Sequence, residues 1–157
     1  QEHHQHDSFL NDGEIDRAYS YILSHPGVPS VFWKHYFDSG DELQGKIRTL
    51  VNARKVAGVH SGSTLHLQQG ARAKGLYAAM VEGTQGRLYV RIGGDDQTWQ
   101  PKETVRVYAQ GDGWKIWLAL PGNPSLQQAP LPSPLEMPLN KTLLSRKDIP
   151  DAWIEGE

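Results

Sequence analysis

The chain contains no cysteine, which excludes a disulfide framework and any chemistry that needs a thiol. It has no apolar run near the roughly 20 residues that a membrane-spanning helix needs, so we expect no membrane partner. Its basic residues are dispersed and the formal net charge is −2, so we expect no nucleic-acid partner. With 157 residues, of which 38% are hydrophobic, the chain is long enough for one globular domain or two small ones.

Histidine is concentrated at the start of the chain. His3, His4 and His6 lie beside the carboxylates of Glu2 and Asp7. Imidazole and carboxylate groups suit zinc and related divalent metals, so these side chains are candidate metal ligands. The alternative is a terminal run without a rigid site, because ligands so close in sequence rarely surround a single ion.

Two helices are predicted in the first third of the chain. Apolar residues recur at helical spacing over residues 13–24, and Pro26 cannot continue that helix. A second helix is predicted over residues 41–57, with Gly58 as its stop signal. Between them, residues 28–33 are apolar on both faces, which is typical of a short parallel strand that is covered on both sides.

The segment after the second helix is predicted to be rich in strands. Apolar and polar residues alternate there with a period of two, and short glycine-containing turns separate the alternating runs. We expect strands over residues 64–68, 75–81, 87–92, 104–109 and 114–119. Five strands joined by short turns form an antiparallel sheet or a small sandwich, so the fold class of the chain is α+β.

Residues 16–33, which include Tyr-Ile-Leu-Ser-His-Pro-Gly-Val-Pro, and the following His35-Tyr-Phe-Asp38 resemble the last barrel unit of α-amylases of glycoside hydrolase family 13. The likeness is to the plant α-amylases and the bacterial maltooligosaccharide-forming amylases. It implies that residues 1–58 are helix 7, strand 8 and helix 8 of a (β/α)8 TIM barrel. It further implies a C-terminal antiparallel five-stranded β-sheet domain over 59–120, before a Pro-rich linker and tail over 121–157.

The resemblance also implies a reaction, the hydrolysis of α-1,4-glucosidic bonds of starch or related glucans. A retaining glycosidase needs two carboxyl groups about 5 Å apart. The family places its catalytic carboxylates and its calcium ligands before the part that this chain resembles. We therefore expect no catalytic residue in this chain, no hydrolysis by the chain alone, and calcium only in the preceding part. That N-terminal part of the same enzyme is a candidate partner, and the resemblance implies a secreted, extracellular protein.

The candidate substrate-binding residues are Tyr77, Trp114, Lys34, His35 and Tyr36. An aromatic face can stack on a sugar ring, although each aromatic residue could instead simply pack in a core. In a whole enzyme, the three residues at 34–36 would lie on the rim of a glucan cleft. Tyr77 falls where some plant α-amylases have a tyrosine in a surface starch-binding site. The histidine that the family places on a neighbouring strand is Gln110 here.

Three functions stay open at this point. The chain could be the C-terminal part of an α-amylase, which predicts exposed apolar faces on the helices and the strand. It could be a stand-alone carbohydrate-binding or interaction module derived from an amylase, which predicts a soluble monomer that binds glucan. A different enzyme that uses His35, Asp38 or the N-terminal histidines has the least support.

Overall fold

The computed structural model of the chain describes residues 11–93 and 98–122. The helices are α1 (Asp12–Ser24), α2 (Trp33–Phe37), α3 (Asp41–Ala57) and α4 (Gln69–Arg72). The strands are β1 (Leu65–Leu67), β2 (Tyr77–Glu82), β3 (Arg87–Ile92), β4 (Arg106–Gly111) and β5 (Trp114–Ala119). Within these ranges no helix is long and apolar enough to cross a membrane. The N-terminal histidines and the tail from residue 123 lie outside the described residues.

Local signals set the ends of the two long helices. At the start of α1, the Asn11 side chain accepts the Glu14 N–H, and the Glu14 carboxylate accepts the Asn11 N–H, which is a capping box. At the end of α3, Gly58 takes a left-handed conformation with φ of 74°, which glycine adopts without steric cost. The helices predicted over residues 13–24 and 41–57 are therefore confirmed.

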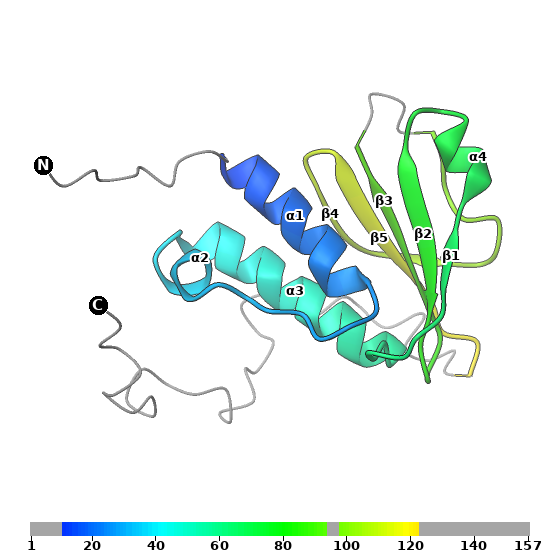
Figure 1. Ribbon diagram of the computed structural model, residues 1–157, viewed down its shortest axis with the longest axis horizontal. Coiled ribbons are helices and arrows are strands. Elements are labelled where there is room, and N and C mark those ends of the chain that lie inside the picture. Colours follow the sequence, from blue (N-terminus) through cyan, green and yellow to red (C-terminus); the bar gives the residue numbers. More distant parts are fainter. Residues whose placement is uncertain (1–10, 94–97, 123–157) are drawn as a thin grey trace, which may run out of the picture.

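The five strands form a single antiparallel sheet in the order β1-β2-β3-β5-β4. Figure 1 shows α1 and α3 on one side of this sheet and the short α4 on the other side. The predicted five-stranded antiparallel sheet is confirmed. The boundaries of β3 and β5 agree with the prediction, while β1, β2 and β4 begin or end one or two residues away from it.

The main hydrophobic core lies between the helix pair and the sheet. Leu23 of α1 and Leu50 of α3 pack there against Val90 of β3 and Trp114 of β5. A smaller cluster on the opposite face of the sheet contains Trp117 and is partly covered by the segment before β4. The two long helices and the sheet therefore share one core in the described part of the chain.

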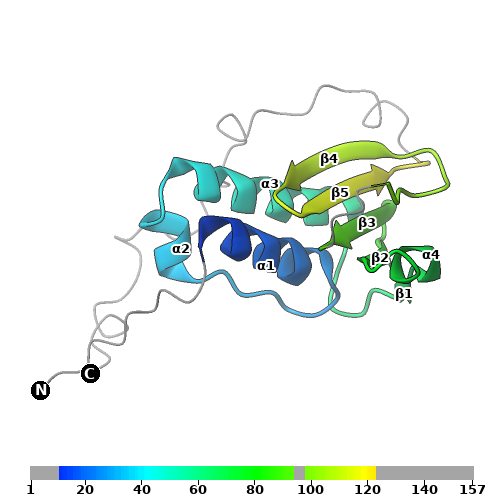
Figure 2. The ribbon, with the colours of Figure 1, turned by 90° about the horizontal axis from the view of Figure 1, so that it is seen from above.

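The buried strand predicted over residues 28–33 is wrong. The chain is irregular from residue 28 to residue 32, and α2 begins at Trp33. Val28 is 90% exposed, and the Phe32 N–H donates to the Tyr19 hydroxyl at 2.9 Å rather than to a strand. A parallel strand needs a neighbouring strand to satisfy its backbone, and the only sheet of the described residues is the antiparallel one. Figure 2 shows α2 at the end of the helix layer that is farther from the sheet.

Candidate functional site

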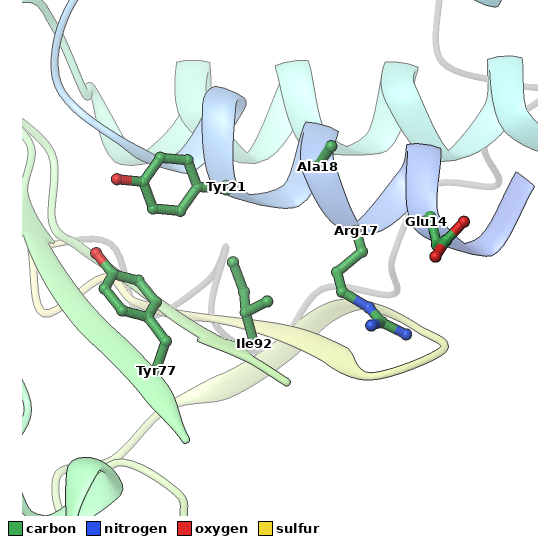
Figure 3. A pocket seen from close by; sticks show the side chains of 6 residues that line it. All are labelled: Glu14, Arg17, Ala18, Tyr21, Tyr77 and Ile92. Atoms are coloured by element: carbon green, nitrogen blue, oxygen red, sulfur yellow. The ribbon is translucent and has the colours of Figure 1, made fainter. Parts of the chain in front are cut away.

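A shallow groove of about 390 Å³ lies between α1 and the strands β2 and β3 (Figure 3). Its surface is almost entirely apolar, and the residues that line it are Glu14, Arg17, Ala18, Tyr21, Tyr77 and Ile92. Tyr77 pairs with Ile92 across β2 and β3, so both side chains lie on the face of the sheet that α1 covers. The groove therefore has one wall from a helix and one wall from the sheet.

Three aromatic rings meet at the Tyr77 end of the groove. The His25 ring stacks on Tyr21, with 3.9 Å between centroids and 27° between the ring planes. The Tyr77 ring centroid lies 5.6 Å from that of His25 and 5.6 Å from that of Tyr21. Tyr21 is 47% exposed although one of its faces is covered by His25. Tyr21 and Tyr77 thus provide aromatic surface from two elements that are distant in sequence.

Hydrogen bonds determine the protonation of His25. Its Nδ1 lies 2.7 Å from the Tyr21 carbonyl oxygen, which can only accept, so Nδ1 carries the proton. In the neutral ring, Nε2 then accepts from the Tyr77 hydroxyl at 2.5 Å. This bond joins the end of α1 to β2 across 52 positions in the sequence.

The environment keeps both partners of this bond neutral. Burial lowers the pKa of His25 below its ordinary value of 6.5; the hydrogen bond to the Tyr21 carbonyl opposes this effect, and the positive charge of Arg54 adds to it. Burial also raises the pKa of Tyr77 to about 12, with a smaller contribution from Tyr21. At neutral pH the contact is therefore an uncharged O–H···N hydrogen bond.

Arg54 of α3 holds the segment that follows α1. Its Nη1 donates to the Leu23 carbonyl at 3.2 Å and to the His25 carbonyl at 2.5 Å. Its Nη2 donates to the Gly27 carbonyl at 2.7 Å. These bonds satisfy carbonyl groups that the end of a helix leaves unpaired. Arg54 thereby fixes the backbone that carries His25.

Three of the predicted sugar contacts lie on α2 and not at the groove. Lys34 is exposed, and burial raises the pKa of Tyr36. The Tyr19 hydroxyl accepts the Phe32 N–H at 2.9 Å and also forms a hydrogen bond with His35 Nδ1 at 3.0 Å. These residues thus belong to a region away from Tyr77, and the structure does not bring the five candidates together.

Trp114 and Gln110 lie elsewhere in the sheet. Trp114 is 1% exposed and packs in the main core, so neither face of its ring is available to a ligand in this structure. Gln110 is on β4, which β3 and β5 separate from β2, so it is not on a strand next to Tyr77. Gln110 pairs with Lys115, and this register places it on the face opposite to Tyr77. Tyr77 therefore has α1 as its neighbour, not Gln110.

Local sequence patterns do not identify Tyr21, His25, Arg17 and Glu14 as site residues. The sequence does contain an indication for Tyr21. This residue lies off the line of apolar residues along its helix, which indicates a side chain that faces something other than the core. In Figure 3 Arg17 extends towards the β4–β5 turn, and its Nε lies 3.3 Å from the Asp112 carbonyl oxygen. Within the described ranges, no group of three histidine or carboxylate residues could hold a metal ion.

The fold and the groove define a small α+β unit in which a helix pair covers one face of a five-stranded antiparallel sheet. Residues 56–118 match the family described as the α-amylase C-terminal β-sheet domain. This match and the amylase relatives support the assignment of the chain as the C-terminal part of an α-amylase of glycoside hydrolase family 13.

Curated relatives agree with this assignment. The chain is 41% identical over 91 residues to a glucan 1,4-alpha-maltotetraohydrolase of Stutzerimonas stutzeri, covering 58% of this chain and 16% of that protein. It is 35% identical over 104 residues to the probable alpha-amylase 2 of Arabidopsis thaliana, covering 66% of this chain and 24% of that protein. An alpha-amylase type B isozyme of Hordeum vulgare is 35% identical over 79 residues, which are 50% of this chain and 47% of that protein. The chain thus spans less than half of each of these relatives.

Proposed function

We propose that this chain is the C-terminal portion of an α-amylase that hydrolyses α-1,4-glucosidic bonds of starch or related glucans. The observation that carries the proposal is the match of residues 56–118 to the α-amylase C-terminal β-sheet domain. The printed name of one relative, which is 41% identical, describes an enzyme that acts on a 1,4-α-glucan. In this proposal the chain supplies no catalytic carboxylate, and any calcium is bound by the part of the enzyme that precedes it.

The proposed partner of the chain is that preceding, catalytic part. Residues 28–37 carry three exposed apolar side chains, Val28, Phe32 and Phe37, which are 90%, 57% and 48% exposed. We call residues 28–37 the apolar segment. Exposed apolar side chains that gather in one segment mark contact sites for other protein surfaces.

A second function, contact with glucan at the groove, is favoured by the two tyrosine rings. Tyr21 and Tyr77 line an apolar surface with a volume suited to a small ligand, and Glu14 and Arg17 lie along the same groove. Exposed aromatic faces suit the apolar faces of a sugar ring. This contact would also serve a stand-alone carbohydrate-binding module derived from an amylase.

A chimeric enzyme tests the main proposal. In the Stutzerimonas stutzeri maltotetraohydrolase, the region that aligns with this chain would be replaced by residues 12–120. We expect the chimera to release sugars from soluble starch, and we expect the 157-residue chain alone to release none. Hydrolysis by the isolated chain, or a folded chimera that is inactive on starch, would contradict the proposal.

Two controls separate the alternatives. A chimera that carries Val28→Ser together with Phe32→Ser should assemble poorly, whereas Leu67→Ser, at an exposed apolar residue outside the apolar segment, should not affect assembly. Gel filtration combined with a glucan pull-down of the isolated chain then tests the module hypothesis. A monomer that binds glucan while no chimera is active would favour the stand-alone module.

A further inference from the structure

We propose that Glu103 is the acid-sensitive attachment of a strap that covers the second face of the sheet, and that this strap loosens over Trp117 when Glu103 is protonated. We call residues 98–105 the strap, and the second face is the face of the sheet opposite to α1 and α3 (Figure 1). The inference goes beyond the proposed function and does not depend on the amylase assignment.

The first step is the position of the strap. β5 lies between β3 and β4 in the sheet, so the connection from β3 to β4 has to cross β5. Trp99 and Val105 of the strap pack against the cluster on the second face that contains Trp117. The Trp99 ring meets the Trp117 ring edge to face, with 5.9 Å between centroids and 78° between the ring planes. Because Trp117 is only 3% exposed, the strap is part of what keeps this ring away from water.

The second step is the attachment of the strap to β3. Arg87 donates from Nε to Glu103 Oε1 at 2.8 Å and from Nη2 to Glu103 Oε2 at 2.6 Å. The Tyr89 hydroxyl donates a third hydrogen bond, to Oε1. Arg87 and Tyr89 are two positions apart on β3, so both side chains lie on the second face. A single carboxylate therefore joins the strap to β3 through three hydrogen bonds, two of them from a charged guanidinium.

The third step is the change that a proton makes. A carboxyl group with the proton on Oε1 can donate it to the Tyr89 hydroxyl, but Nε of Arg87 then loses its acceptor. A proton on Oε2 removes the acceptor of Nη2 in the same way. In either case the two-bond contact with Arg87 becomes a single bond, and the guanidinium loses the negative charge that it faces. Protonation therefore weakens the attachment, whichever oxygen takes the proton.

The pH range follows from the groups that face Glu103. The hydrogen bond from Arg87 is the main cause that lowers the pKa of Glu103 below its ordinary value of 4.5; burial opposes it, and the Tyr89 hydrogen bond adds to it. Among the described residues, these two side chains of β3 are the charged and titratable groups that act on the Glu103 carboxyl. Because the pKa is lowered in the folded state, the attachment is stabilised above pH 4.5, and this contribution is lost as the pH falls below that value.

The expected effect is local and modest. The side chains of Glu103 and Arg87 are 31% and 37% exposed, and water screens such an ion pair. At the other end of the strap, Arg91 donates to the Trp99 carbonyl at 3.2 Å, a bond that involves no carboxyl group. We therefore expect local opening of the strap to increase by about threefold to tenfold on protonation, while the main core stays closed.

The test is an NMR titration of the full chain from about pH 6.5 to about pH 3, which follows the Glu103 carboxyl signal and the tryptophan indole signals. These signals are assigned by their loss in Glu103→Gln, Trp99→Phe and Trp117→Phe. The indole signals of Trp99 and Trp117 should shift with the midpoint of Glu103. Trp114, which is 1% exposed in the main core, reports on global unfolding and should not follow this midpoint. The protection of the strap amides against hydrogen exchange, on either side of the midpoint, measures the change in local opening.

Variants separate the titration of Glu103 from other effects of acid. Glu103→Gln mimics the protonated carboxyl group, since its amide keeps one acceptor oxygen and carries no charge. The strap of this variant should be looser already at neutral pH, and the two indole signals should lose their pH dependence. Tyr89→Phe removes a bond that favours the charged carboxylate, so the transition should persist with its midpoint at a higher pH. Glu82→Gln, at an exposed carboxylate paired with His66, is the matched control and should leave the transition unchanged.

Three results would overturn the inference. The first is a pair of Trp99 and Trp117 indole signals that do not follow the Glu103 titration, and the second is a transition of these signals that persists in Glu103→Gln. The third is a transition that they share with Trp114, because the strap would then open only when the whole chain unfolds. A transition confined to the second face, absent from Glu103→Gln and retained in Glu82→Gln, supports the inference.

Discussion

At the scale of single residues, Arg54 connects α3 to the end of α1. The guanidinium is buried and donates to three backbone carbonyls, those of Leu23, His25 and Gly27. Its planar group with several donors suits this task, which the single ammonium of a lysine would perform less well. The segment that carries His25 is therefore held by α3.

We expect Arg54→Met to lower the free energy of unfolding by about 2–4 kcal/mol, because carbonyl groups that are buried would lose charged donors. Urea unfolding followed by circular dichroism measures the loss. Lys55→Met, at the exposed neighbouring position, is the control and should change stability by less than about 0.5 kcal/mol. Equal stability of the two variants would contradict the role assigned to Arg54.

At the scale of elements, the turn between β2 and β3 docks on the end of α3. The Gln85 N–H donates to the Ala57 carbonyl at 3.0 Å, and the Thr84 N–H donates to the Gly58 carbonyl at 3.0 Å. Gly83 makes this approach possible, because a Cβ atom at that position would lie 1.9 Å from the Ala57 carbonyl oxygen. The carbonyl groups at the C-terminal end of α3 are thus satisfied by a hairpin of the sheet.

Gly83→Ala should therefore destabilise the chain by about 1–3 kcal/mol, since backbone atoms and not a flexible side chain would have to move. Thermal unfolding of the variant beside the parent measures the effect. Gly70→Ala is the matched control, because its Cβ would meet only the Trp99 ring at ordinary contact distance. A Gly83→Ala variant with the melting temperature of Gly70→Ala would show that the docking does not depend on this close approach.

At the scale of the whole molecule, the helix pair and the sheet complete one core while the apolar segment stays uncovered. A protein that exposes such a segment tends to associate with itself or with a partner. We expect the isolated chain to self-associate as its concentration rises, which sedimentation velocity detects. The Val28→Ser, Phe32→Ser double variant should remain monomeric to a higher concentration.

The control for association is Leu67→Ser on β1, which removes an exposed apolar side chain outside the apolar segment. This variant should sediment like the parent. If instead the parent, the double variant and Leu67→Ser all sediment alike, the apolar segment is not the contact surface. Another surface of the chain would then have to contact the catalytic part of an amylase.

Much of the fold could be predicted because its signals are local. The limits of α3, β3 and β5 follow from caps, turns and the period of the apolar residues, which act over a few positions. The strand expected over residues 28–33 failed for the opposite reason. A strand exists only beside another strand, and its apolar residues alone could not show whether one is present.

The sequence by itself determined the two long helices, the antiparallel sheet and the resemblance to α-amylases, since these depend on local patterns and on a long matching string. Only the tertiary structure decided which side chains form the site. The register of β5 on β3 places Trp114 opposite Ile92 and inside the core, and the packing of α1 on the sheet brings Tyr21 and His25 to Tyr77. The contact between His25 and Tyr77 joins residues 52 positions apart, so it depends on how the elements pack and not on the neighbours of each residue in the chain.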